Sequence, residues 1–524
     1  MPELREWGKD LVMLARLGRD LPPRLRAPLD AHVIRGRVTA RLANRGRAFA
    51  DALDTLVFQN PGSPYRSLFS CAGAELGDVR ALVDSDGLEG ALTVLAARGL
   101  YVRIDELKGQ REVVRGSFRT WFDPDAFNHP ALSGHLAINT GGSGRRPSRV
   151  RYSLQFLEEW ACSVALAATA HGFAAPTQVF WWPVPMAHAM MAGMVGQSVA
   201  GWFYPVHPLP FAAHCFARWV SLVSVSAGCR IPGPRRLDLQ EPERMAHWLA
   251  RERRERGPML LWATSSACAR LGRAAWDAGL SLDGVACLAT AEPMTETRLQ
   301  EARRASMRVI VGYSSVDVSA PAYGCAAPDA VDDMHVMLDR CALISHRRRV
   351  NEDGPEIDAL LSTSLSMHAP KVAINCETGD YGVLEERDCG CSLGGLPMRR
   401  HLKHVGSFEK LSTEGVTFAR TDLLRILEEV LPRRFGGALH DYQVAEEEEA
   451  GGAPTLVIRV SPSLGALDEA AVRETFVAAL SAGGGGNAYF ARVLDAMGTA
   501  RVRREPPRAT AAGKVLPLHL LPRP

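Results

Sequence analysis

The stretch that decides the fold is residues 257–315, GPMLLWATSSACARLGRAAWDAGLSLDGVACLATAEPMTETRLQEARRASMRVIVGYSS. It holds three short apolar runs, GPMLLWAT at 257–264, GVACLAT at 284–290 and MRVIVGYSS at 307–315, with a helical segment between each and the next. The run TQVFWWPV at 177–184 has the same character. Strands that alternate with amphipathic helices are typical of an α/β domain with a largely parallel sheet. We predict this domain over residues 135–325.

The flanking segments have other patterns. Residues 1–60 carry apolar positions at helical spacing and predict helices. After residue 340 come short strand-like runs with turn signals, CALISH, PKVAINCETGD, YGVLEE and FEKLSTEGVTF, which favour an antiparallel sheet or small barrel. From about residue 419 a helix, the strand pair DYQVAEEEE and TLVIRVSP, a second helix and the strand ARVRRE predict a compact α+β unit. The fold prediction is therefore α/β: a large domain over 1–408 with mixed parallel sheets and a strand-rich subdomain, and a small mobile α+β domain over 409–524.

The composition and charge of the chain limit the classes of protein to which it can belong. The chain has 524 residues, 47% of them hydrophobic and 23% charged, which is typical of an ordered protein with more than one core. Its 61 basic and 58 acidic residues give a formal charge of +3, so we expect neither a nucleic-acid nor a membrane partner. A polar N-terminus and eleven scattered cysteines favour reduced thiols and a cytoplasmic location.

A loop rich in small residues follows the apolar run HLAI. It reads NTGGSGRRPS over 139–148. Small residues let backbone N–H groups approach a polyphosphate closely, and the arginines add positive charge. The run has neither P-loop nor dinucleotide spacing, so an ordinary flexible loop also explains it.

Two charged residues stand beside glycines. Asp380 ends the run Thr378-Gly379-Asp380, which we expect at a strand end, where its carboxylate can accept both ribose hydroxyls of a nucleotide. Lys514 follows the small-residue loop RATAAG and can reach a neighbouring domain as a point charge. The alternative interpretations are that Thr378-Gly379-Asp380 is a common turn and that Lys514 is an ordinary surface lysine.

Three cysteines and a histidine suit zinc by ligand type. Cys389 and Cys391 form a C-x-C pair, and Cys325 and His335 lie upstream. Thiolates and imidazole are the ligands of tetrahedral structural zinc sites. The spacing is not that of a standard finger, so unrelated buried thiols are the alternative.

The order of these pieces resembles one superfamily, the adenylate-forming enzymes: acyl–coenzyme A synthetases, peptide-synthetase adenylation domains and luciferase. Within it the chain looks like the phenylacetate–coenzyme A ligase branch. The segments that carry the resemblance over residues 135–420 are Ala291-Glu292-Pro293, Tyr313-Ser314-Ser315-Val316-Asp317, Gly324-Cys325, Met334-His335-Val336-Met337-Leu338-Asp339, Glu377-Thr378-Gly379-Asp380 and Asp388-Cys389-Gly390-Cys391. The last matching residue along the sequence is Lys514.

The resemblance implies a role for each matching residue. The ATP phosphates would be held by Thr140, Gly141, Gly142, Ser143 and Gly144. Ala291, Glu292 and Pro293 would lie along the adenine, Tyr313 would stack near the adenine or acyl group, and Asp380 would bind the ribose. Asp317 would hold Mg²⁺, and Lys514 would bridge phosphate and carboxylate. A structural Zn²⁺ would be bound by Cys325, His335, Cys389 and Cys391.

The implied activity is ATP-dependent activation of a carboxylic acid, aryl or acyl, as an acyl-adenylate, with pyrophosphate release and transfer to a thiol such as coenzyme A. The first alternative passes the acyl group to a carrier protein or an amine, and the second is a binding relative without catalysis. The aromatic segment Phe180–His188 matches the branch's acyl pocket, with ordinary core packing as the alternative.

The sequence departs from the branch at three places. The phosphate loop has T-G-G-S-G where S-G-T-T-G is usual, and Asp317 replaces a Glu. The hinge segment is His404-Val405-Gly406-Ser407, without the usual arginine; Lys403 is a candidate substitute and Glu409 the candidate hinge acid. The residues for the first half-reaction are in place, and the departure at the hinge bears on the second half-reaction, which needs rotation about that hinge.

Overall fold

The computed structural model describes residues 2–139, 149–182, 186–204, 211–238, 241–315, 318, 321–349, 356–407, 412–413, 416–417, 423–448, 454–482, 500–509 and 515–519. None of the helices in these ranges combines the length and the apolar character that a membrane span requires.

The N-terminal region is helical, as its periodicity predicts. Its elements are α1 (Pro2–Arg26), α2 (Ala31–Ala43), α3 (Arg45–Leu53), η1 (Asp54–Phe58), α4 (Pro64–Ala72), α5 (Leu76–Ala97) and α6 (Ile104–Leu107). The short elements β1 (Val113–Arg115), β2 (Phe118–Thr120), η2 (Pro124–Phe127), β3 (Leu136–Asn139) and β4 (Arg149–Tyr152) follow. Strands β3 and β4 pair as a hairpin.

Twelve strands of the described residues form one sheet, and half of it is parallel. In spatial order this half is β10 (Arg308–Tyr313), β9 (Val285–Thr290), β8 (Met259–Thr264), β5 (Thr177–Trp181), β6 (Val199–Tyr204) and β7 (Arg235–Arg236). All neighbouring pairs are parallel. Every residue of β5 and β8 is buried, because helices cover both faces of a parallel sheet. The α/β prediction for this region is confirmed.

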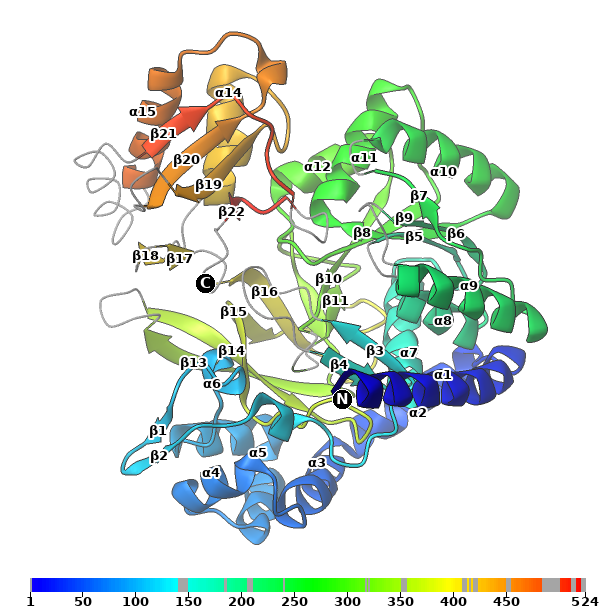
Figure 1. Cartoon of the computed structure of the whole chain (residues 1–524), viewed down its shortest axis with the longest axis vertical. Coiled ribbons are helices and arrows are strands. Elements are labelled where there is room, and N and C mark those ends of the chain that lie inside the picture. Colours follow the sequence, from blue (N-terminus) through cyan, green and yellow to red (C-terminus); the bar gives the residue numbers. More distant parts are fainter. Residues whose placement is uncertain are drawn as a thin grey trace.

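Helices lie on both sides of this half (Figure 1). Helices α10 (Pro242–Arg256), α11 (Ser265–Asp277) and α12 (Glu296–Arg304) form one layer. Helices α7 (Leu154–Ala170), α8 (Met186–Met194) and α9 (Phe211–Ser226) lie with α1 and α2 in the other.

The antiparallel half continues the same sheet beyond β10. Its order is β11 (Ala322–Gly324), β12 (Met334–Val336), β16 (Arg400–Ser407), β15 (Cys376–Glu386), β14 (Glu356–Ser364) and β13 (Cys341–Arg349). The antiparallel pairing predicted after residue 340 is therefore present, but these strands extend the parallel sheet instead of closing a barrel. The short strands β17 (Ser412–Thr413) and β18 (Val416–Thr417) pair with each other.

One sequence interpretation is wrong in detail. Thr378-Gly379-Asp380 does not end a strand, and the runs CETGD and YGVLEE form the single strand β15. The strand continues because Gly379 adopts φ +84°, and the pairing with β14 shifts between the partners of Ala359 and Leu361. Such a bulge bends a strand and interrupts the regular alternation of its side chains.

The C-terminal residues form a separate α+β unit, drawn in orange and red in Figure 1. A helical stretch of α13 (Leu423–Arg425), η3 (Ile426–Val430) and α14 (Leu431–Phe435) precedes the hairpin β19 (Tyr442–Glu448) and β20 (Pro454–Val460). The turn η4 (Pro462–Leu464), α15 (Glu469–Ala482), β21 (Ala500–Arg503) and β22 (Leu518–His519) complete it. Strands β21 and β22 pair in parallel with β20 and β19. Its apolar core, which includes Leu427, Ile458 and Phe476, is separate from the cores of the large sheet.

Candidate active site

A cavity of about 220 Å³ lies between the carboxyl ends of the central strands and the C-terminal unit. Five residues that the sequence predicts at a nucleotide site are described by the structure, and all of them line this cavity: Ala291, Glu292, Pro293, Tyr313 and Asp380. They come from three segments that lie far apart in the chain. Clefts outside the carboxyl ends of parallel strands are the usual ligand sites of such sheets.

The loop after β9 is fixed by the start of α11. The backbone N–H of Ser266 donates to Oε2 of Glu292 at 2.8 Å, and the Ser265 hydroxyl donates to the Glu292 carbonyl at 2.9 Å. A carboxylate at a helix N-terminus is favoured by the helix dipole. Ala291 takes φ +69°, which is uncommon for a residue with a side chain and marks a backbone held in place by its surroundings.

Tyr313 and Asp380 meet across the cavity wall. The Tyr313 hydroxyl donates to Oδ2 of Asp380 at 3.0 Å, and the Asp380 N–H donates to Thr378 Oγ1 at 3.2 Å. Burial, with the neighbouring Asp380 charge, raises the pKa of Tyr313 well above its ordinary value. The phenol therefore stays protonated and donates its hydrogen to the Asp380 carboxylate.

The C-terminal unit closes the cavity from the opposite side. Leu423, Leu424 and the run Val515–Leu518 line it. Val515 is the residue that follows Lys514 in the sequence. Lys514 itself, together with Asp317 and the predicted phosphate loop Thr140, Gly141, Gly142, Ser143 and Gly144, lies outside the described residues.

A buried ion pair joins the C-terminal unit to this site. Arg298 donates from Nη2 to Oε1 of Glu428 at 2.7 Å, and Thr295 donates to the other carboxylate oxygen of Glu428 at 2.7 Å. Arg298 also donates to the Pro293 carbonyl at 2.9 Å. The sequence does not predict this contact, because an Arg and a Glu 130 positions apart leave no local signal.

The predicted hinge segment borders the cavity through Val405, Gly406 and Ser407. Asp332, another cavity residue missed by sequence analysis, accepts the backbone N–H groups of His404 and Val405 at 3.0 and 2.8 Å. Lys403 is engaged elsewhere, with Nζ 2.6 Å from Glu385 and 3.1 Å from Asp329. Glu409 lies outside the described residues.

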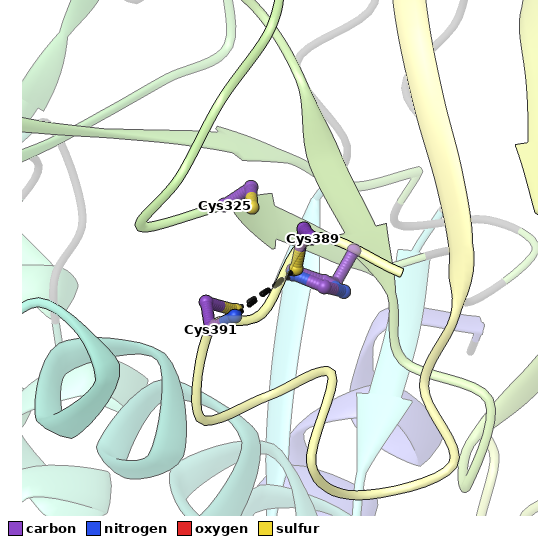
Figure 2. Close-up of side chains that lie close together, drawn as sticks. Cys325, Cys389 and Cys391 are labelled. Carbon is purple, nitrogen blue, oxygen red and sulfur yellow. Dashed lines mark hydrogen bonds between the residues drawn. The ribbon is translucent and has the colours of Figure 1, made fainter. Parts of the chain in front are cut away.

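The predicted zinc ligands lie together. One donor atom from each of Cys325, His335, Cys389 and Cys391 lies within 4.8 Å of all the others. Figure 2 shows the three cysteine side chains turned toward one another, and its dashed line marks the Cys391 N–H bonded to Cys389 Sγ at 3.4 Å. His335 Nε2 lies 3.2 Å from Cys391 Sγ and 3.5 Å from Cys389 Sγ.

The donor chemistry of this cluster fits a zinc ion. His335 Nδ1 bonds the Met398 carbonyl at 2.7 Å, which assigns the proton to Nδ1 and leaves the Nε2 lone pair facing the sulfurs. Burial lowers the pKa of His335 to about 4, so the imidazole is neutral, as a metal ligand must be. Burial raises the pKa of Cys325, while backbone N–H groups near Cys391 outweigh its burial and lower its pKa.

The aromatic segment is core rather than open wall where the structure describes it. His188 is buried, and its ring centroid lies 4.5 Å from that of Trp262 and 5.3 Å from that of Trp160. Burial lowers the pKa of His188 to about 4, and its Nδ1 has no hydrogen-bond partner. Residues 183–185 lie outside the described part.

Comparisons with known proteins give no family assignment. No family model matches the chain, and no curated protein matches it. Solved structures align over nearly its whole length, among them a 2-hydroxyisobutyryl-CoA ligase in complex with 2-HIB-AMP and CoA. That alignment has 16% identity, covers 95% of this chain and 91% of that one, and has a TM-score of 0.43. The amide bond synthetase McbA from Marinactinospora thermotolerans aligns at 14% identity, 95% and 98% coverage and a TM-score of 0.43. Likeness at this level carries no argument about function.

Proposed function

We propose that this chain uses ATP to activate a carboxylic acid as an acyl-adenylate, releases pyrophosphate, and passes the acyl group to a thiol such as coenzyme A. The observation that carries the proposal is the convergence of Ala291, Glu292, Pro293, Tyr313 and Asp380 on one cavity. Their order in the sequence suggested nucleotide binding, and their positions in space are independent of that order.

The cavity residues suit a nucleoside. Tyr313 offers a ring face for the base, and its bond to Asp380 orients the carboxylate. An ionised carboxylate can accept from two vicinal hydroxyls, which is what a ribose presents. The loop at 291–293, fixed by Ser265 and Ser266, gives the base a rigid edge.

The chemistry follows from the need to turn a poor electrophile into a good one. A carboxylate oxygen attacks the α-phosphorus of ATP, the bond from that phosphorus to the bridging oxygen breaks, and pyrophosphate leaves. Two anions must meet, so neutralising their charge is the main catalytic task. We assign it to Lys514 and to the backbone N–H groups of Thr140–Gly144, while Mg²⁺ held by Asp317 supplies further positive charge when bound.

The two domains and the cysteine–histidine cluster also have roles in this function. Residues 409–524 form a mobile unit that carries Lys514 to the cavity, and residues 1–408 hold the nucleotide. Zn²⁺ bound by Cys325, His335, Cys389 and Cys391 is structural, because four protein donors leave no open position. A cytoplasmic location is supported by the cysteines, all eleven of which are free thiols.

Product analysis tests the proposal. Purified protein is incubated with ATP, Mg²⁺ and single members of a panel of aryl and fatty acids, and the nucleotides are separated. An acid-dependent conversion of ATP to AMP and pyrophosphate is expected. Formation of ADP, or no nucleotide turnover with any acid of the panel, would rule the proposal out.

A further inference from the structure

A second cavity, of about 540 Å³, lies beside β6, near the β7 edge of the sheet. It is lined by the loop before β6, the first residues of β6, the loop before β7, the last residue of α10 and the end of α1. The parallel strands all run in one direction, so the loop before β6 and the end of α10, just before β8, lie at their amino ends. The active-site cavity borders the carboxyl ends, beside the C-terminal unit, which lies on the other side of the view from β6 and α9 (Figure 1). The two cavities are therefore separate.

The charge of this second cavity is positive. Three arginines line it, Arg230, Arg235 and Arg256, and none of its lining residues is acidic. No carboxylate of the described residues pairs with Arg230 or Arg235. Arg256 donates from Nε to Glu252 at 2.7 Å, and its two Nη groups remain for another acceptor. Cations gathered around a concave space without matching acids attract an anion.

Aromatic rings hold one of these arginines in place. The guanidinium of Arg235 lies over the Phe203 ring of β6, 5.5 Å from its centroid, and 6.0 Å from the centroid of the Trp248 ring of α10. A guanidinium that rests with its face on a ring keeps the N–H groups at its edge for hydrogen bonds, and this edge matches two oxygens of a phosphate group.

A buried amide adds a neutral donor, and a chain of hydrogen bonds fixes its orientation. Trp262 Nε1 donates to Gln178 Oε1 at 2.8 Å, and Gln178 Nε2 donates to Gln197 Oε1 at 2.6 Å. Because the indole N–H can only donate, it decides which way both amides face. Gln197 is 6% exposed and lines the cavity, and its Nε2 group has no acceptor among the described residues. Buried donors are normally satisfied, so this one calls for an acceptor inside the cavity.

The size and the lining of the cavity limit the ligand. Its volume lies in the range of small-molecule sites, roughly 300–1,000 Å³. No aromatic side chain lines it, so nothing in the lining would stack on a nucleotide base. Three guanidinium groups require more negative charge than one carboxylate carries, whereas a phosphate ester carries about −1.5 to −2 at pH 7.

We propose that this cavity binds a small phosphorylated molecule without a base, such as a sugar phosphate. Arg230, Arg235 and Arg256 would bind its phosphate oxygens, and the Nε2 group of Gln197 would donate to a further oxygen. Arginine suits this role because its planar fork binds phosphate through two parallel hydrogen bonds. The site lies away from the active-site cavity, and the proposal does not depend on the function proposed above.

Calorimetry tests the site with fructose 1,6-bisphosphate, glucose 6-phosphate and inorganic phosphate as probes. The sugar phosphates should bind the wild type more tightly than inorganic phosphate does, and more weakly as the salt concentration rises. Arg230→Gln and Gln197→Glu should each weaken that binding about 10- to 100-fold, the loss expected for a hydrogen bond to a charged group. Gln197→Glu keeps an acceptor for Gln178 and replaces the free donor with a negative charge.

Matched controls locate the binding. Arg254→Gln changes an exposed arginine of α10 that does not line the cavity, and Asp380→Ala changes the active-site cavity. Both should leave the affinity for the sugar phosphates within about twofold, since neither removes a proposed contact. Cys229 lines the second cavity, so a bound sugar phosphate should slow its alkylation, whereas the exposed Cys71 should react at the same rate with and without the probe.

The melting temperature of each variant shows that it is folded, and if Gln197→Glu fails to fold, the exposed Arg230 decides alone. Four results would overturn the inference: no binding of either sugar phosphate to the wild type, an unchanged affinity in Arg230→Gln, a loss as large in Arg254→Gln or Asp380→Ala, or alkylation of Cys229 that the probes do not slow. None of them bears on the proposed function, which acid-dependent conversion of ATP tests separately.

Discussion

Arg298 of α12 and Glu428 of η3 form an ion pair in which both side chains are nearly inaccessible to water, 2% and 6% exposed. The pair links a helix of the parallel half of the sheet to the C-terminal unit, beside the cavity that both units line. The same guanidinium bonds the Pro293 carbonyl, so the C-terminal unit is tied to the loop predicted to hold the adenine.

Glu428→Gln should lower the free energy of unfolding by about 3 kcal/mol, since it leaves the buried Arg298 without its main counter-ion. The neighbouring Glu429 is a matched control, because its pair with Arg433 at 3.7 Å lies at the surface. Glu429→Gln should change the free energy by less than about 1 kcal/mol. Equal effects of the two variants in urea titrations would show that the ion pair does not hold the unit.

Asp380→Ala should weaken ATP binding about 10- to 100-fold, the loss expected for hydrogen bonds to a charged acceptor. The ribose assignment adds a sharper expectation: 2′-deoxy-ATP should bind more weakly than ATP to the wild type, but nearly as well as ATP to the variant. Calorimetry measures both, and Glu386→Ala on the same strand, whose partner is Arg400, is the control. An unchanged affinity for ATP in Asp380→Ala would show that Asp380 does not bind the ribose and that Thr378-Gly379-Asp380 is only a structural bulge.

Purified wild-type protein should contain about one zinc ion per chain, by the coordination number of structural sites. Cys389→Ser and Cys391→Ser should lose zinc and thermal stability together, since metal binding and folding are coupled. Cys71→Ser is the control, because Cys71 is exposed and belongs to no metal-like cluster of the described residues. Metal analysis that finds no zinc in protein prepared without chelators would contradict the site.

The buried carboxyl group of Glu377 should make the stability of the fold depend on pH. Burial raises its pKa to about 7 from 4.5, despite the nearby Arg348. A raised carboxyl pKa means that the folded state binds the proton more tightly, so the stabilisation is complete below about pH 4.5 and is lost as the pH rises through 7. Over that window the wild type should lose roughly 3 kcal/mol relative to Glu377→Gln, at 1.36 kcal/mol per pKa unit. A stability difference between the two proteins that is constant from pH 5 to pH 8 would contradict it.

The sequence predicts the fold where periodicity carries the signal. The apolar runs at 177–184, 257–264, 284–290 and 307–315 contain β5, β8, β9 and β10, because fully buried parallel strands are continuously apolar. It misplaces Asp380, because a glycine at positive φ serves a bulge inside β15 as well as a turn.

The candidate site likewise contains some residues that the sequence predicts and others that it does not. Motif order predicts residues such as Tyr313 and Asp380, which meet in space. Arg298 and Glu428 leave no such trace, because their roles depend on burial and on partners far away in the chain.

Exchange of labelled pyrophosphate into ATP tests the central claim most directly, because it reports reversible formation of an acyl-adenylate and needs no acceptor. The wild type should catalyse exchange only when an acid is present, and Lys514→Ala should lower the rate roughly 10²–10³-fold, as expected for the loss of a key electrostatic group. The fold of the variant, checked by circular dichroism, should be unchanged. Acid-independent exchange, no exchange with any acid, or a near-wild-type rate in Lys514→Ala would contradict the account.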